Sequence, residues 1–113
     1  MSCLFCRIVA GEIPAEIVYE TSQCLAFRDI NPQAPVHILV IPRKHIASLD
    51  RATAEDKSVL GDLLLAGAEI ARREGLGERG FRTVINTGAG AGQSVFHIHA
   101  HIIGDRPLGW PPG

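Results

Sequence analysis

The alternation of hydrophobic and polar positions predicts several short strands in the first third of the chain. Ile17–Glu20 and Cys24–Asp29 are two strand candidates on either side of a three-residue polar turn, so a hairpin is the simplest interpretation. Val36–Ile41 is almost continuously apolar and β-branched, as expected of a central strand that is buried on both faces. Asn31–Pro35, which precedes it, contains two prolines that fix φ and remove donors, and it predicts a loop.

A helical pattern occupies the middle of the chain. Thr53–Asp56 is typical of an acidic helix cap, and the apolar residues that follow it recur at helical spacing. We therefore predict a helix over Ala54–Glu74 that stops at Gly75. Two more strands are predicted after it, over Phe81–Asn86 and Val95–Ile103. The expected fold is α+β, a single domain over residues 1–113 in which antiparallel strands pack against one long helix.

Length and net charge limit the kinds of molecule that the protein is expected to bind. The 113 residues, 46% of them hydrophobic, suit one domain with one core. Eleven Lys and Arg oppose twelve Asp and Glu, which gives a formal net charge of −1. A protein that coats DNA or RNA normally carries a basic excess, so we expect no polymeric nucleic acid as a partner. A small phosphorylated ligand remains compatible with this charge, because dipoles and imidazoles can hold one phosphate.

Three features of the sequence argue for a cytoplasmic protein that does not enter a membrane. Thr83–Gly104 is the only stretch of spanning length without Asp, Glu, Lys or Arg, and its histidines, amides and glycines would be costly in a bilayer. The N-terminus lacks a basic segment followed by an apolar one, so no secretory signal is expected. Three cysteines are an odd number for a disulfide framework, and reduced thiols or a metal site fit better.

The strongest chemical signal is the alternation of His97, His99 and His101 with apolar residues. Alternate side chains of a strand share one face, and a rise of about 3.3 Å per residue would place successive histidines about 6.6 Å apart. Ile98 and Ala100, with Ile102, would then face the core. A lone histidine on a strand is most often a hydrogen-bonded core residue, but three on one face without a nearby carboxylate favour a chemical role.

Two kinds of chemistry fit such a row of imidazoles. A His-x-His pair on a strand can chelate a metal. Alternatively, one imidazole is a nucleophile while its neighbours bind and protonate a phosphate. The glycine-rich Gly88–Gly92, followed by Gln93 and Ser94, favours phosphate, because small residues let backbone N–H groups approach an oxyanion. This loop alone would be a weak signal, since it lacks the features of a dinucleotide or P-loop motif.

The segment Gln93–Ile103, which reads His-φ-His-φ-His-φ-φ over its last seven residues, resembles the signature of the histidine-triad (HIT) superfamily. Asp29–His37 and Val40–Ile46 resemble the branch of histidine-triad nucleotide-binding (Hint) proteins, as does the ending Trp110–Gly113. The resemblance covers nearly the whole chain. It implies a HIT-like fold: a five-stranded antiparallel sheet, one long helix and a short N-terminal helix, with the sheet extended across a homodimer.

The resemblance also implies an activity, the hydrolysis of purine nucleoside phosphoramidates through a covalent nucleotidyl-histidine. No cofactor is required for this chemistry, and the expected ligands are purine nucleoside monophosphates and phosphoramidates. By position, His99 is the implied nucleophile. The other implied catalytic residues are His101, Ser94, His37 and His97. The implied nucleotide-binding residues are Asp29, Ile30, Phe5, Ile8, Phe27, Asn86, Gly92, Gln93, Ser94, His99, His101 and Trp110.

Within that set, the resemblance gives the residues different tasks. His101, Gln93 and Ser94 would contact the α-phosphate, with Asn86 beside it, and Asp29 would bind the ribose hydroxyls. The base would lie in a cleft formed by Phe5, Ile8, Phe27 and Ile30. His37 and His97 would orient the imidazoles, and Trp110 would reach towards the substrate cleft of the partner subunit.

A metal site and two alternative functions complete the expectations. Cys3 and Cys6, with His45 and His97, resemble a Cys2His2 zinc site of some HIT proteins, and two thiolates with two imidazoles suit tetrahedral Zn²⁺. Cys24 is expected to be a small buried apolar residue. One alternative function is dinucleoside polyphosphate hydrolysis by the same triad, against which the Trp-Pro-Pro-Gly ending argues. The other is a nucleotide-binding interaction module with little catalysis.

Overall fold

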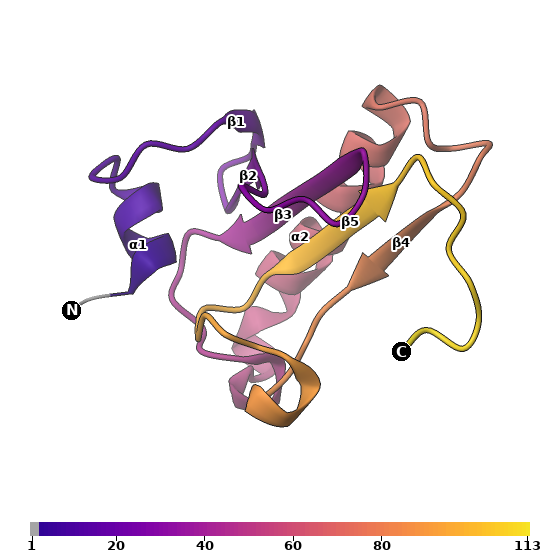
Figure 1. Ribbon diagram of the computed structural model, residues 1–113. Coiled ribbons are helices and arrows are strands. Elements are labelled where there is room, and N and C mark those ends of the chain that lie inside the picture. The colour runs from indigo at the N-terminus through magenta and orange to yellow at the C-terminus, as the bar shows by residue number, and fades with distance from the viewer. Residues whose placement is uncertain (1–2) are drawn as a thin grey trace.

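A five-stranded antiparallel sheet with helices on both faces forms the framework of the protein (Figure 1). The computed structural model describes residues 3–113. The strand order is β1-β2-β3-β5-β4, and every neighbouring pair is antiparallel. The strands are β1 (Ile17–Glu20), β2 (Cys24–Arg28), β3 (Val36–Pro42), β4 (Phe81–Val84) and β5 (Ala100–Gly104). The helices are α1 (Leu4–Val9) and α2 (Lys57–Arg73). The α+β prediction is therefore confirmed, including one long helix and a short N-terminal helix.

The two faces of the sheet carry separate apolar clusters. The first cluster joins β2, β3 and β5 to α2, and its fully buried members include Ile38, Val40, Leu63 and Ile102. The helix approaches β5 so closely at Gly67 that a Cβ there would lie 2.7 Å from Cδ1 of Ile102. The second cluster, on the opposite face, joins β2 and β3 to α1. Its buried members are Phe5, Ile8, Leu25, Phe27, Leu39 and Ile41.

The helix prediction is confirmed with a small adjustment at its beginning. Residues 54–56 form a 3₁₀ turn that leads directly into α2. Thr53 and Asp56 form a capping box there, in which each side chain accepts from the backbone N–H groups at this end. The hairpin of β1 and β2 is also confirmed. No helix within residues 3–113 is long and apolar enough to cross a membrane.

The two last strands are shorter than predicted. β4 ends at Val84 rather than at Asn86, and β5 begins at Ala100 rather than at Val95. Residues 95–99 lie outside the sheet: β4 ends at Val84, opposite His101, and the pairing of β5 with β3 goes no further than Ala100 opposite Val40. The backbone N–H of Ile98 instead donates to the carbonyl oxygen of Ile46, at 2.7 Å. The expectation that His97, His99 and His101 lie on one regular strand is therefore wrong.

Candidate active site

Side chains from Ile98 to Ile102 still alternate between the two faces of the sheet, although β5 is shorter than predicted. Ile98, Ala100 and Ile102 are buried in the cluster under α2, as expected. His99 and His101 lie on the opposite face, with their ring centroids 5.0 Å apart. His37 of β3 joins them, 5.1 Å from His101. The site is thus a row of three imidazoles, His37, His101 and His99, at the junction of β3 and β5.

A chain of hydrogen bonds fixes the tautomers of His37 and His101. The backbone N–H of Gln33 donates to Nδ1 of His37 at 3.0 Å, so the proton of a neutral His37 is on Nε2. That Nε2–H donates to Nδ1 of His101 at 2.9 Å, which leaves the proton of His101 on its own Nε2. His101 therefore presents a donor to the space beside it, as binding of an anionic oxygen requires.

In His99 the donor and acceptor nitrogens are exchanged relative to those of His101. Its Nδ1–H donates to the carbonyl oxygen of His97 at 2.8 Å, so its Nε2 carries a free lone pair. The ring is 7% exposed and contacts the edge of Phe5, with centroids 5.1 Å apart. A neutral, oriented imidazole with a free nitrogen is suited to nucleophilic attack.

Burial keeps His37 and His101 uncharged. It lowers the pKa of His101 to about 4, and the neighbouring His99 and His37 lower that pKa further. Burial also lowers the pKa of His37, although the Asp29 carboxylate acts in the opposite direction. Both rings are therefore neutral at pH 7, which is the state that the hydrogen-bond chain requires.

A cavity of about 400 Å³ opens beside His99 and His101. Phe5, Ile8 and Phe27 are buried and form its apolar wall, whereas Ile30 is fully exposed at its mouth. Asp29 and Ser94 supply polar groups to the same cavity. Asp29 accepts from the backbone N–H of Asn31 at 2.8 Å through Oδ1, while its Oδ2 lies 3.4 Å from Nε2 of His37. One cavity thus combines an apolar slot, a carboxylate and two imidazoles.

Other residues implied by the resemblance lie around this cavity rather than in it. The buried Gln93 side chain holds the glycine-rich loop: its Nε2 donates to the carbonyl oxygens of Ala47 and Val95, and its Oε1 accepts from the N–H of Gly88. Gly92 has a left-handed backbone (φ +93°) and lies next to the amide of Asn86. Trp110 is 84% exposed in the C-terminal tail and does not line the cavity of its own chain.

The first triad histidine belongs to a different cluster. His97 is fully buried, and its Nε2–H donates to the carbonyl oxygen of Pro42 at 2.7 Å. Its Nδ1 is therefore an acceptor, and it lies 3.4 Å from Sγ of Cys3 and 3.5 Å from Sγ of Cys6. Sγ of Cys6 is in turn 3.3 Å from Nδ1 of His45. The four donor atoms all lie within 4.8 Å of one another.

This cluster of Cys3, Cys6, His45 and His97 fits zinc. Bonds of about 2.3 Å to sulfur and 2.0 Å to nitrogen in a tetrahedron place sulfur and nitrogen about 3.6 Å apart. The measured separations of 3.3 to 3.5 Å are close to that value. The bond from His97 to Pro42 also matches the outer hydrogen bond that metal-binding histidines usually make.

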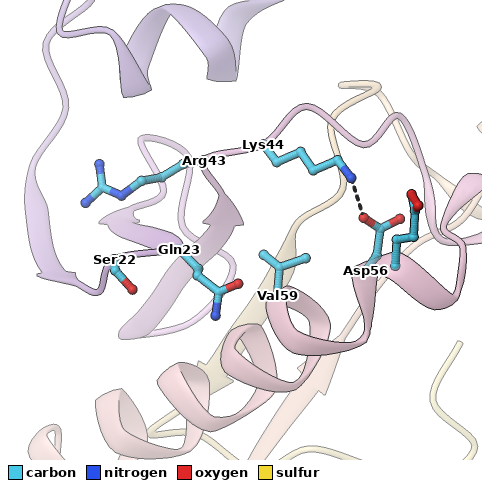
Figure 2. A pocket seen from close by; sticks show the side chains of 7 residues that line it. Ser22, Gln23, Arg43, Lys44, Asp56 and Val59 are labelled. Carbon is cyan, nitrogen blue, oxygen red and sulfur yellow. Dashed lines mark hydrogen bonds and ion pairs between the residues drawn. The ribbon is translucent and has the colours of Figure 1, made fainter.

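A second cavity lies at the start of α2 and contains none of these groups (Figure 2). Its volume is about 270 Å³, and its walls carry Lys44 and the buried Asp56, which form an ion pair of 2.7 Å. Asp56 also accepts from the backbone N–H of Thr53. The carboxylate of Asp56 is therefore engaged both in capping the helix and in the ion pair with Lys44.

Sequence reasoning missed two contributions to the site. The backbone of Gln33 sets the tautomer of His37, and no side-chain pattern could reveal this contact. Leu39 lines the cavity, and its position could have been found, because it lies two residues from His37 on the same strand face. Cys24 is buried in the core as expected, and burial raises the pKa of its thiol to about 12.

Comparison with known proteins gives a consistent picture. The HIT domain model matches residues 10–108. The chain is 60% identical over 110 residues to an uncharacterized HIT-like protein of Synechococcus elongatus, covering 97% of this chain and 96% of that protein. It is 52% identical over 103 residues to Protein HitA of Neisseria gonorrhoeae, covering 91% and 95% respectively.

Solved structures agree with the sequence comparison. A HIT family hydrolase from Legionella pneumophila has a TM-score of 0.97 and 50% identity, over 99% of this chain and 100% of that chain. A histidine triad nucleotide-binding protein from Candida albicans has a TM-score of 0.84 and 33% identity, over 97% and 83%. The fold is thus similar to those of a HIT family hydrolase and of a histidine triad nucleotide-binding protein.

Proposed function

The chain belongs to the HIT domain family, and we propose that it is a purine nucleoside phosphoramidate hydrolase of the Hint branch. The observation that carries the proposal is the pairing of two nitrogens at one cavity: the free Nε2 of His99 and the Nε2–H of His101. One is a nucleophile and the other a donor to a phosphate oxygen, which is what nucleotidyl transfer needs.

The proposed reaction has two steps. Nε2 of His99 bonds to the α-phosphorus while the bond from phosphorus to the leaving nitrogen breaks, and the amine departs with a proton passed by Ser94. Nδ1–H of His99 keeps its bond to the carbonyl of His97, which stabilises the positive charge that develops on the ring. Water then attacks phosphorus, the bond to Nε2 breaks, one proton of the water replaces the proton that Ser94 gave up, and the nucleoside monophosphate leaves with the water oxygen.

The cavity supports a purine nucleotide as substrate. Phe5, Ile8 and Phe27 offer apolar contact for a base, and Ile30 is exposed at the opening. Asp29 has lone pairs left for the ribose hydroxyls after accepting from Asn31. The glycine-rich loop, held by Gln93 next to Asn86, is suited to the phosphate, and contact of Gln93 with that phosphate stays a prediction.

We also propose a structural zinc ion held by Cys3, Cys6, His45 and His97. Bound there, it would tie α1 to the segment that precedes β5. All four positions of a tetrahedral ion are filled by protein, so no position is open for substrate and the ion takes no part in the hydrolysis. The cysteines are free thiols, which is consistent with the expected cytoplasmic location.

A homodimer is part of the proposal. β4 is an edge strand of the sheet, and its Phe81 is 37% exposed. On α2, Leu64 is 52% exposed and Leu65 is 70% exposed. Pairing of β4 with its copy would extend the sheet across a two-fold axis and cover exposed apolar surface. Trp110 would then be free to reach the partner's cleft.

The decisive experiment is a comparison of substrates in one assay. We expect turnover of adenosine and guanosine phosphoramidates with release of the amine and the nucleoside monophosphate, detected by chromatography. Faster turnover of diadenosine polyphosphates would instead place the protein with the dinucleoside polyphosphate hydrolases. Tight binding of AMP without turnover of any phosphoramidate would show an interaction module and contradict the proposal.

A further inference from the structure

Arg106 contacts the loop that holds His37, although it lies at the opposite end of β5 from His99. Its exposed side chain belongs to the segment that directly follows β5. Nε of Arg106 donates to the carbonyl oxygen of Gln33 at 3.0 Å, and a terminal N–H donates to the carbonyl oxygen of Pro107 at 3.0 Å. A bond from a charged guanidinium to a carbonyl is stronger than a bond between neutral groups. Arg106 therefore anchors Gln33 to the segment after β5.

The sheet register and a sharp turn bring Arg106 to this loop. Gly104, the last residue of β5, is paired with Val36, the first residue of β3. The segment after β5 therefore passes beside the segment before β3. Asp105 has a left-handed backbone (φ +69°), which is uncommon for a residue with a Cβ, and its carboxylate is paired with Arg79. This ion pair supports the turn from which the side chain of Arg106 extends.

Gln33 has both of its backbone groups bound. Its N–H donates to Nδ1 of His37 at 3.0 Å, while its carbonyl oxygen accepts from Arg106. Its side-chain amide also donates to the carbonyl oxygen of Asn31 at 3.0 Å, and the ring of Pro32 fixes φ on its N-terminal side. Rotation of either peptide group beside Gln33 would break one of these bonds. The bond from Arg106 thus helps to keep the N–H directed at His37.

Loss of that direction would reverse the hydrogen-bond chain between the histidines. A neutral imidazole carries its proton on either ring nitrogen, and its partners decide which one. Without the N–H of Gln33, the proton of His37 is free to occupy Nδ1. Nε2 of His37 would then face Nδ1 of His101, 2.9 Å away, as one acceptor against another, unless the proton of His101 also moved to Nδ1. Nε2 of His101 would be left without a proton to donate.

We propose that Arg106 is a positioning residue that acts through Gln33. Its bond to the Gln33 carbonyl maintains the Nε2–H tautomers of His37 and His101. His101 donates to a phosphate oxygen in the proposed function, on which this inference rests for its link to catalysis. Negative charge on that oxygen grows in the transition state, so a correctly placed donor accelerates the reaction more than it strengthens substrate binding.

The tautomers are measured directly by nitrogen-15 NMR of the whole chain labelled at histidine. Long-range proton–nitrogen correlations at pH 8 show which ring nitrogen of each histidine carries the proton. We expect the wild type to show the Nε2–H form for His37 and His101, and the Nδ1–H form for His99. In Arg106→Met, the Nδ1–H form should appear for His37 and His101 as well. His99 serves as an internal reference, because its Nδ1–H is held by the carbonyl of His97.

Two further variants identify the responsible contact. Arg106→Lys keeps a charged donor within reach of Gln33, so it should retain the wild-type tautomers. The matched control is Arg43→Met: Nε of Arg43 also donates to a backbone carbonyl, that of Thr21 at 3.1 Å, but at the opposite end of β3 from Gln33. Its loss should leave all three tautomers unchanged. Because Arg106 is exposed, Arg106→Met should fold, as thermal unfolding would show.

Turnover of an adenosine phosphoramidate provides a second readout. We expect Arg106→Met to lower kcat about fivefold, the size of one net hydrogen bond, and to raise KM less. This split between kcat and KM is expected because the apolar wall of the cavity is unchanged. Arg106→Lys and Arg43→Met should keep kcat close to that of the wild type.

The outcomes separate this inference from the proposed function. Unchanged tautomers in Arg106→Met would overturn the positioning role, whatever the kcat of the variant. Shifted tautomers with unchanged kcat in an active enzyme would overturn the link to catalysis, and an equal shift in Arg106→Lys would overturn the role of a charged donor. If the wild type hydrolyses no phosphoramidate but Arg106→Met still shifts the tautomers of His37 and His101, the positioning of the rings stands and the hydrolase is refuted.

Discussion

Individual hydrogen bonds give the histidines different roles. His97 uses its backbone carbonyl to hold His99 and its ring to join the cysteine cluster. Nδ1 of His37 accepts from the Gln33 N–H, and Nε2–H of His37 donates to Nδ1 of His101. These contacts make His99 Nε2 the free acceptor of the row and His101 Nε2 the free donor, although all three triad residues are the same type.

His99→Ala is expected to abolish turnover and to leave nucleotide binding largely intact, since Asp29 and the apolar wall are unchanged. In the wild type, quenching a reaction with labelled substrate should trap an acid-labile, base-stable phosphoramidate. The peptide that contains His99 should carry the label, as mass spectrometry would show. A label on the His97 or His101 position, or normal turnover by His99→Ala, would refute the mechanism.

His101 should make stability depend on pH. Burial, together with His99 and His37, lowers its pKa to about 4, and only the Asp29 carboxylate opposes this shift. The unfolded chain, with a histidine pKa near 6.5, binds the proton more readily, so the free energy of unfolding should fall as pH drops from about 6.5 to 4. His101→Gln should reduce that loss, as urea denaturation at pH 7 and pH 5 would measure. An identical loss in the variant would show that His101 does not contribute.

At the scale of elements, α1 and residues 95–99 depend on each other. α1 is only six residues long, too short to be stable alone. Phe5 and Ile8 pack it onto the sheet, and Cys3 and Cys6 connect it to His97. Both the apolar wall of the cavity beside His99 and the support of His99 therefore depend on this junction.

The double change Cys3→Ser, Cys6→Ser should remove zinc and loosen α1. We expect about one zinc per chain in the wild type prepared without chelator, and none in the variant, by elemental analysis. Nucleotide affinity should fall because Phe5 and Ile8 lose their support, while some hydrolysis should survive. Cys24→Ala is the matched control, a buried cysteine outside the cluster that should lower stability without changing zinc content. Native wild-type protein that contains no zinc would contradict the proposed zinc site.

At the scale of the whole molecule, exposed apolar surface and an unpaired edge strand occur together. Phe81 belongs to the edge strand β4, and Leu65 is the most exposed of the large apolar residues on α2. A chain of 113 residues gains only modest stability from its own core. Covering this apolar surface in a dimer would therefore add to the stability of the folded state.

We expect sedimentation at micromolar concentration to show a dimer of the 12.1 kDa chain. Phe81→Glu should shift the equilibrium towards the monomer, because it would bury a charge at the two-fold axis. Leu49→Glu changes another exposed apolar residue, outside β4 and α2, and should leave the dimer intact. A monomer as the active species of the wild type would contradict the proposed assembly.

The sequence alone determined the features that depend on local pattern. Apolar periodicity identified the long helix and the hairpin, and alternation placed Ile98, Ala100 and Ile102 in the core. The spacing of the histidines, with the motifs around them, identified the family that the comparisons show. These features are readable because side-chain periods of two and of 3.6 residues are properties of the chain itself.

Tertiary structure decided what depends on contacts between distant residues. Residues 95–99 lie outside the sheet, where the backbone N–H of Ile98 donates to the carbonyl oxygen of Ile46 instead of pairing with a strand. The roles of His37 and His101 depend on Gln33 and on each other, although 64 residues separate His37 from His101 along the chain. Proton positions follow from which donor meets which ring nitrogen, and that meeting exists only once β3, β5 and their loops have packed together.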